Sequence, residues 1–303
     1  MRELVCPICG GTRARQLYRE TLAGEPGARR EAPILNPEGV RYRINRCAGC
    51  SLVYSSPILD EAEVAALYIR SPHTNVREGE EDHVRRTFEG YYRLLRPRLG
   101  RRDRMLDIGC DVGILLAIAR HDGFGEVFGV EPNPLAAKQA ARIPDSRISG
   151  EFYEVTRYPA EHFDLVTMIH VVDHLVDVNR FLARVLRDLR PGGLALAVVH
   201  NVSSLLARVL GQRFPPFNIY HHYFFSPRTL RLLFERAGFE VVHVGPTWNR
   251  YSLGFLATRT PVISGQLRSA VEWGLSGSGL GRLAVTLPLG NVGIVARKPG
   301  SPS

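Results

Sequence analysis

The chain has 303 residues, 45% of them hydrophobic and 23% charged, and a formal net charge of +9 at pH 7. These proportions are typical of a globular protein and exclude a disordered chain, a collagen or a coiled coil as the main class. The length suits one catalytic domain plus a small module. The sequence has neither a basic tail, nor a signal-peptide pattern, nor an unbroken apolar run of membrane-spanning length. We therefore expect a cytoplasmic protein without a membrane span.

The first chemical feature along the chain is a pair of C-x2-C motifs, formed by Cys6 and Cys9 and by Cys47 and Cys50. Two such pairs in a cytosolic protein predict a zinc site, and four thiolates leave no open coordination position. We therefore expect a structural Zn²⁺, the alternative being four unrelated thiols. Alternation over 40–44 predicts a strand that enters the second motif, and 23–28 has the composition of a loop.

Between the cysteines and the remainder of the chain, the pattern predicts two helices and a linker. The helices are expected at 60–69 and 82–99, where apolar residues recur at helical spacing. The polar stretch between them is expected to join two domains. The predicted organisation is a zinc-binding module at 1–70, a linker at 71–81 and a catalytic domain at 82–303.

From residue 104 onward, short apolar runs alternate with helical patterns. Strands are expected at 105–109, 126–131, 163–170 and 194–200. Helices are expected at 114–120, from 134, and from 178 to about 189, the last ended by Pro191-Gly192-Gly193. Such alternation predicts a parallel sheet with right-handed crossovers, which is an α/β doubly wound fold of the Rossmann-like class.

The loop after the first of these strands, residues 107–113, indicates the cofactor class. A dinucleotide fingerprint requires glycine where this chain has Asp111 and Ile114, and the Asp111 carboxylate would repel a diphosphate. S-adenosylmethionine fits better because it presents an ammonium, a sulfonium and a ribose diol. Asp107 or Asp111 would lie near its cationic end, and Glu131 would accept hydrogen bonds from the ribose hydroxyls.

Four motifs carry a resemblance to a known family. Leu106-Asp107-Ile108-Gly109-Cys110-Asp111-Val112-Gly113 resembles the L-D-I-G-C-G-x-G motif of class I S-adenosylmethionine-dependent methyltransferases. The segments 130–133, 163–166 and 189–193 resemble three further motifs of that family in the same order, and Val172-Asp173-His174 stands where the family often has L-E-H. The resemblance covers about residues 82–298 and implies a mostly parallel seven-stranded sheet. It assigns cofactor binding to Asp107, Gly109, Cys110, Asp111, Gly113, Glu131, Pro132, Asn133 and His170.

The fused cysteine module, a zinc ribbon in this resemblance, and the segment 221–226 narrow it to a bacterial subgroup. That subgroup acts on small molecules and includes C-methyltransferases of deoxysugar and other natural-product pathways. The expected partner is therefore a small-molecule methyl acceptor, methylated on carbon or oxygen, rather than a nucleic acid. The alternative is an RNA or protein methyltransferase whose ribbon grips the macromolecule through its arginines, and a non-catalytic cofactor-binding regulator is a third possibility.

A methyl acceptor that is a hydroxyl or a carbon acid must lose a proton, and histidine is the side chain suited to accept it near neutral pH. Two groups of residues follow the fourth and fifth strands, where the acceptor pocket is expected. The candidates for the general base are His221 and His170 first, then His222 and His174, with Tyr223 beside them.

Overall fold

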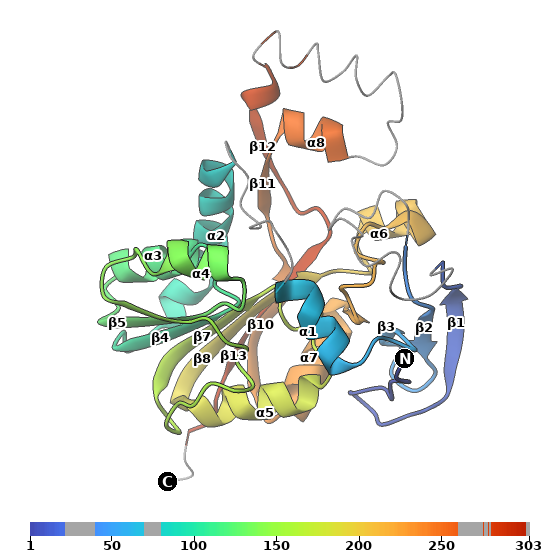
Figure 1. Ribbon diagram of the computed structural model, residues 1–303, viewed down its shortest axis with the longest axis horizontal. Coiled ribbons are helices and arrows are strands. Elements are labelled where there is room, and N and C mark those ends of the chain that lie inside the picture. Colours follow the sequence, from blue (N-terminus) through green and yellow to red (C-terminus); the bar gives the residue numbers. More distant parts are fainter. Residues whose placement is uncertain (22–39, 70–79, 260–274, 276–277, 279, 301–303) are drawn as a thin grey trace.

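A computed structural model describes residues 1–21, 40–69, 80–259, 275, 278 and 280–300 of the chain (Figure 1). The loop expected at 23–28 and nearly all of the expected linker lie outside the described residues. The domain boundaries given above therefore stay predictions. Among the described residues, no helix is both long enough and apolar enough to cross a membrane.

The centre of the molecule is a seven-stranded sheet in the order β10-β13-β8-β7-β4-β5-β6. Its strands are β4 (Arg104–Ile108), β5 (Glu126–Val130), β6 (Ser146–Ser149), β7 (Phe163–Ile169), β8 (Leu189–His200), β10 (Glu240–Pro246) and β13 (Asn291–Arg297). Neighbouring strands from β8 to β6 pair in parallel, whereas β13 runs antiparallel to both β8 and β10. The expected Rossmann-like, mostly parallel seven-stranded sheet is confirmed.

Helices cover both faces of this sheet. Figure 1 shows α2 (Glu81–Leu95), α3 (Ile114–His121) and α4 (Pro134–Ala140) on one face, with α5 (Val178–Asp188) and α7 (Pro227–Arg236) on the other. Successive residues of β4 point to opposite faces of the sheet. Met105 belongs to the buried cluster that includes residues of α2 and α3, and Leu106 belongs to the cluster that includes residues of α5 and α7. The whole of β7 is buried, as expected for a central strand of a sheet that is covered on both faces.

The four cysteines belong to a second, antiparallel sheet in the order β1-β2-β3-β9. Three strands come from the N-terminal region, namely β1 (Ala14–Tyr18), β2 (Ile44–Cys47) and β3 (Val53–Ser55), and α1 (Glu61–Ile69) follows them. The fourth, β9 (Tyr223–Phe224), comes from the segment between β8 and α7, and it pairs with β3 through Tyr54 and Val53. The cysteine module therefore shares a sheet with the catalytic part of the chain.

The remaining elements connect or extend these two sheets. They are the helices α6 (Leu205–Leu210) and α8 (Leu253–Arg259), the hairpin strands β11 (Asn249–Ser252) and β12 (Ala284–Leu287), and the 3₁₀ turns η1 (Arg96–Arg98), η2 (Gly211–Arg213) and η3 (Leu280–Arg282). Figure 1 shows α8, β11 and β12 extending beyond the central sheet.

Three expected boundaries were wrong. The helix expected at 82–99 ends at Leu95 and is followed by the 3₁₀ turn η1. The strand expected at 40–44 begins only at Ile44. The helix expected to reach Leu189 ends at Asp188, and β8 starts there rather than at 194. Leu189 pairs with Phe163 of β7, and the N–H of Gly192 donates to the carbonyl of Lys298.

Candidate functional site

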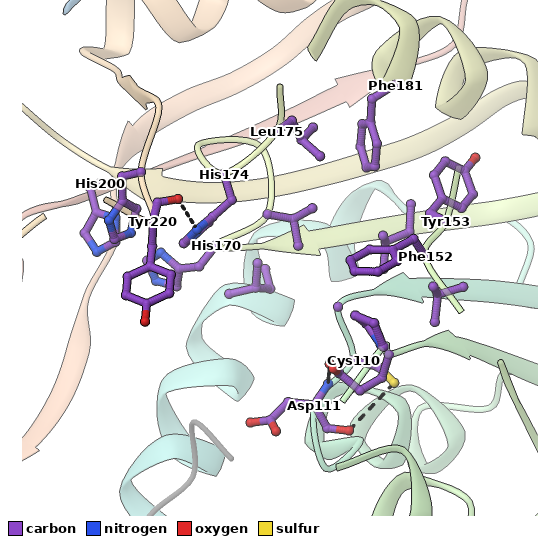
Figure 2. A pocket seen from close by; sticks show the side chains of 18 of the residues that line it. Cys110, Asp111, Phe152, Tyr153, His170, His174, Leu175, Phe181, His200 and Tyr220 are labelled. Carbon is purple, nitrogen blue, oxygen red and sulfur yellow. Dashed lines mark hydrogen bonds between the residues drawn. The ribbon is translucent and has the colours of Figure 1, made fainter. Parts of the chain in front are cut away.

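A cavity of about 1080 Å³ lies at the edge of the sheet where the parallel strands end. The residues that follow β4, β5 and β7 and the last residue of β8 all line it. In Figure 2, Cys110 and Asp111 lie on one side of this cavity, and His170, His174 and His200 lie on the other. We call the first side the carboxylate end, defined by Asp107, Asp111 and Glu131. The second is the histidine end, defined by His170, His174, His200 and His221.

The loop between β4 and α3 has a backbone that requires glycine at two positions. Gly109 and Gly113 have φ angles of +72° and +84°. A Cβ on Gly109 would lie 2.8 Å from Cγ2 of Val171, and one on Gly113 would lie 2.4 Å from Cδ1 of Ile143. Gly109 lines the cavity, whereas Gly113 is the N-cap residue of α3 and packs against α4.

Glu131 fixes this loop from the end of the neighbouring strand. One carboxylate oxygen accepts the N–H of Asp111 at 2.9 Å, and the other accepts the N–H of Asn133 at 2.8 Å. Asn133 in turn caps α4 by accepting the N–H of Leu135. Burial raises the pKa of Glu131, and the two backbone hydrogen bonds oppose that rise. Each carboxylate oxygen has a second lone pair, so Glu131 can still accept two hydroxyl groups.

Asp107 is the most deeply buried carboxyl of this end. Burial raises its pKa to about 7, against a hydrogen bond from the Thr167 hydroxyl at 2.6 Å, and Glu131 and Asp111 raise it further. A cofactor that carries cationic groups and a diol would satisfy three converging carboxyl groups, whereas a diphosphate would be repelled. The residues of the carboxylate end therefore fit S-adenosylmethionine.

The histidine end is assembled from three segments of the chain. His170 and His174 follow β7, His200 ends β8, and His221 precedes β9. The ring centroids of His174 and His221 lie 4.3 Å apart, and His200 lies 4.6 Å from both His170 and His221. Asp173 lies fully buried at their centre and accepts a hydrogen bond from Nδ1 of His200 at 2.8 Å.

The structure brings together most of the residues expected from the sequence. Every expected cofactor residue except Gly113 lines the cavity. Of the expected catalytic residues, His170, His174 and His221 also line it, whereas His222 and Tyr223 do not. The Nδ1 atom of His222 lies 3.1 Å from the carbonyl oxygen of Leu175, and the Tyr223 hydroxyl donates to Val176. The catalytic roles of these two residues stay predictions that the geometry does not favour.

His200 and the Asn218–Tyr220 segment were missed. His200 carried one readable signal, since it is the last residue of a predicted strand, and Glu131 and His170 were selected for the same position. Asn218 and Tyr220 carried none, because their role depends on contacts with histidines 3 and 46 residues away.

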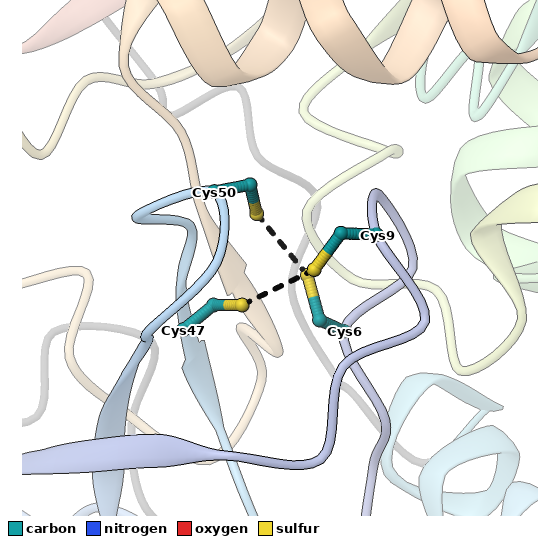
Figure 3. Close-up of side chains that lie close together, drawn as sticks. All are labelled: Cys6, Cys9, Cys47 and Cys50. Atoms are coloured by element: carbon teal, nitrogen blue, oxygen red, sulfur yellow. Dashed lines mark hydrogen bonds between the residues drawn. The ribbon is translucent and has the colours of Figure 1, made fainter.

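The four cysteines lie close together (Figure 3), Cys6 and Cys9 before β1, and Cys47 and Cys50 at and after the end of β2. The Sγ atoms of Cys6 and Cys50 are 3.3 Å apart, those of Cys9 and Cys47 are 3.4 Å apart, and all four lie within 4.8 Å of one another. All are free thiols. A Cβ on Gly49 would lie 3.2 Å from Sγ of Cys9, so a larger residue there would crowd the cysteine cluster. This arrangement fits a tetrahedral Zn²⁺, whose bonds to sulfur measure about 2.3 Å.

Known proteins resemble part of this chain. The chain shares 37% identity over 102 residues with a ubiquinone biosynthesis O-methyltransferase of Rhodopseudomonas palustris (strain BisB18), which covers 32% of this chain and 40% of that protein. The match thus spans less than half the length of the curated relative.

Two solved structures share the fold. A putative methyltransferase from Bacillus halodurans C-125 has a TM-score of 0.52 and 17% identity, covering 70% of this chain and 99% of that one. A putative methyltransferase solved in complex with the Haloferax volcanii Trm112 methyltransferase activator has a TM-score of 0.51 and 18% identity, covering 73% and 92%. Residues 81–244, more than half of the chain, match the sequence model of a methyltransferase domain. The chain therefore belongs to the methyltransferase-domain family.

Proposed function

We propose that this enzyme methylates a carbon or an oxygen atom of a small molecule, as a step of a biosynthetic pathway. The observation that carries the proposal is the single cavity that joins the carboxylate end to the histidine end. One end has the chemistry for the methyl donor, and the other has polar side chains that can hold an acceptor. The ubiquinone biosynthesis O-methyltransferase that shares sequence with this chain supports a small acceptor.

The carboxylate end would hold the cofactor, which supplies an electrophilic methyl group on a sulfonium. Glu131 would accept hydrogen bonds from the ribose hydroxyls, since each of its oxygens retains an acceptor site beside its backbone partner. Asp107 and Asp111 would face the cationic end. A cation beside Asp107 would stabilise its carboxylate form and so lower its raised pKa.

The histidine end would hold the acceptor under a cover made by distant parts of the chain. The cover consists of Glu61, Val64 and Ala65 of α1, the segment around Phe214 and Tyr220, and Phe255 of α8. Because elements of the cysteine module and of the catalytic part meet over one cavity, the acceptor must fit inside it. Of the residues expected to act on the acceptor, we retain His221, His170 and His174, because their side chains line this end.

The proposed role of the cysteine site is structural. A Zn²⁺ held by Cys6, Cys9, Cys47 and Cys50 would fix the two turns that flank β1 and β2. The sheet formed by these strands continues through β3 into β9, which begins two residues after His221. The metal would thereby hold the cover and the histidine end in place, without touching either substrate.

The alternative, an RNA or protein methyltransferase, requires an exposed basic face on the module. Arg41 is buried and hydrogen-bonds the carbonyl of Arg19, and Arg43 pairs with Glu3 at 3.0 Å. These two arginines therefore serve the module itself, whereas Arg13, Arg15, Arg19 and Arg46 are exposed. The cavity that joins the two ends favours a small substrate, and the exposed arginines make a macromolecular substrate the alternative outcome of the test.

The test follows a labelled methyl group. The protein is incubated with methyl-labelled S-adenosylmethionine and, separately, with a small-molecule extract, an RNA fraction and a protein fraction of a bacterial lysate. We expect label to enter only the small-molecule fraction. Incorporation into RNA or protein alone would replace the proposal by its alternative.

A further inference from the structure

Asp173 is a buried carboxylate that the proposed methyl transfer does not explain. It is 0% exposed and lies among the four imidazoles of the histidine end. Its Oδ2 atom accepts the hydrogen bond from Nδ1 of His200. Among the residues that the structure describes, its Oδ1 atom has no hydrogen-bond partner. A buried carboxylate oxygen without a donor is costly, so it indicates a missing positive group.

The tautomers of the two nearest histidines show why they do not supply that donor. Nδ1 of His174 lies 2.8 Å from the carbonyl oxygen of Tyr220. A carbonyl only accepts hydrogen bonds, so Nδ1 carries the proton and Nε2 of the neutral ring is a lone pair. This Nε2 lies 3.8 Å from Oδ1 of Asp173. Two acceptors therefore face each other at this position.

His221 repeats the arrangement. Its Nδ1 lies 2.8 Å from Oδ1 of Asn218, and that oxygen is identified because it also accepts the N–H of Tyr220 at 2.9 Å. His221 therefore also directs an Nε2 lone pair toward Asp173, 4.0 Å from its Oδ2 atom. Oδ1 of Asp173 and the Nε2 atoms of His174 and His221 therefore converge, while Oδ2 of Asp173 accepts the proton on Nδ1 of His200.

We propose that Asp173, His174 and His221 bind a divalent transition-metal cation. Their ligand atoms lie within 4.8 Å of one another, and two imidazoles with one carboxylate form a ligand set typical of such ions. Each imidazole donates its other N–H to an oxygen acceptor, as metal-binding histidines do.

A second grouping within the same distance, His170, Asp173 and His200, fits less well. Nδ1 of His200 donates its proton to Asp173 at 2.8 Å, so this nitrogen orients the carboxylate and cannot itself be a ligand. His200 is therefore a partner of the carboxylate rather than of the metal.

The position of the site indicates what the cation would contact. Both His174 and His221 line the cavity, so the coordination positions that the protein leaves open face the acceptor. The metal would take an oxygen atom of the acceptor as a further ligand. This last step rests on the proposed function, whereas the metal site itself does not.

The test is a titration of the full-length, chelator-treated protein with Co²⁺, followed by absorption and calorimetry. We expect two equivalents, of which one has the charge-transfer band of a thiolate site and the other lacks it. Asp173→Asn and His221→Gln should each weaken the thiolate-free equivalent by at least about 100-fold. Asn218→Ala, which removes an outer partner, should weaken it by roughly 10- to 100-fold.

The matched control is His222→Gln, which changes the adjacent buried histidine that does not line the cavity. This variant should keep both equivalents. The proposal is overturned if wild-type protein binds Co²⁺ only at the thiolates, or if Asp173→Asn keeps the second equivalent. If Asp173→Asn loses its fold by circular dichroism, His221→Gln decides. Calorimetry with S-adenosylmethionine alone reports separately on the proposed function.

Discussion

The two ends of the cavity are built in different ways. The carboxylate end comes from two short segments, 107–113 and 131–133, and its geometry is set by backbone hydrogen bonds and left-handed glycines. The histidine end comes from three segments up to 51 residues apart, from His170 to His221, and its geometry is set by contacts between side chains. Backbone constraints of the first kind leave a motif in the sequence, whereas contacts of the second kind leave only scattered residues.

The largest effect is expected from the loss of zinc, which should disturb the histidine end and leave the carboxylate end intact. Cys47→Ser should lose the metal, because three thiolates and a hydroxyl bind Zn²⁺ poorly, and structural zinc contributes about 10–16 kcal/mol of apparent binding free energy in small modules. The cover and the histidine end should loosen, since β3 and β9 share a sheet with β2. The carboxylate end should keep its affinity for S-adenosylmethionine.

Zinc content, limited proteolysis and calorimetry measure these three effects. Cys110→Ser is the control for zinc content and proteolysis only, because this buried cysteine lies in the cofactor loop and apart from the other four. A wild-type protein that is folded and active without zinc would contradict the prediction.

The next effect concerns the carboxylate end and its dependence on pH. The folded pKa of Asp107 is about 7, above its ordinary value of 3.8, so ionisation opposes folding. Stability should therefore fall as pH rises from about 4 to about 7 and then level off. Asp107→Asn removes this loss. The difference in unfolding free energy between the variant and wild type should therefore be more favourable to the variant at pH 8 than at pH 4, by up to roughly 4 kcal/mol.

Urea denaturation at several pH values measures this difference. Glu126→Gln is a control of opposite sign, because Arg104 lowers the pKa of Glu126. If the difference in unfolding free energy between wild type and Asp107→Asn did not change with pH, Asp107 would not be the carboxyl whose ionisation opposes folding.

A smaller effect should come from the backbone of the loop. Gly113→Ala would place a Cβ 2.4 Å from Ile143 and 3.2 Å from Ala140, at a φ of +84°. We expect a loss of about 2–4 kcal/mol in unfolding free energy, from backbone strain and overpacking together. Gly192→Ala, at a φ of +77° with no atom within 4 Å, should lose only the strain, about 1–2 kcal/mol. Equal losses in the two variants would mean that the loop does not pack tightly on α4.

Glu131→Ala tests the binding role of the carboxylate end. It should weaken S-adenosylmethionine by about 1.5–3 kcal/mol, which is roughly 10- to 150-fold, because charge-assisted hydrogen bonds are lost. Calorimetry measures the change. Glu126→Ala, at the opposite end of the same strand β5, should bind as wild type does. Unchanged affinity in Glu131→Ala would remove the ribose assignment.

The smallest expected effect on stability lies at the histidine end. His170 has a φ of +53°, so His170→Gly should relieve strain and gain up to about 1 kcal/mol of stability while losing methyl transfer. Glu161→Gly, at a φ of +57° and outside the cavity lining, should gain similarly and keep activity. Thermal unfolding and turnover measure the two. Full turnover in His170→Gly would show that this ring does not serve the acceptor.

These differences also explain which parts could be predicted. Strands β4, β5, β7 and β8 followed from short apolar runs, whereas β6, β10 and β13 were not located and the seven-stranded sheet followed only from the resemblance. The loop followed from Gly109, Gly113 and Glu131, whose roles are local. His200 was missed although it ends a predicted strand, because its role depends on its contact with Asp173, 27 residues earlier. His221 and His222 were both candidates for the general base. Only the fold shows that His221 lines the cavity, whereas His222 contacts the carbonyl of Leu175.

The pairing of β3 with β9 has a consequence for how this protein can be altered. A strand of two residues, Tyr223–Phe224, completes a sheet whose other strands all lie before residue 56. Cutting the chain between the two regions would leave a hydrogen-bonding edge exposed on each fragment. An exchange of cysteine modules between related enzymes would therefore succeed only if β9 is exchanged together with its module. His221, which we propose to contact the acceptor, would be exchanged together with β9.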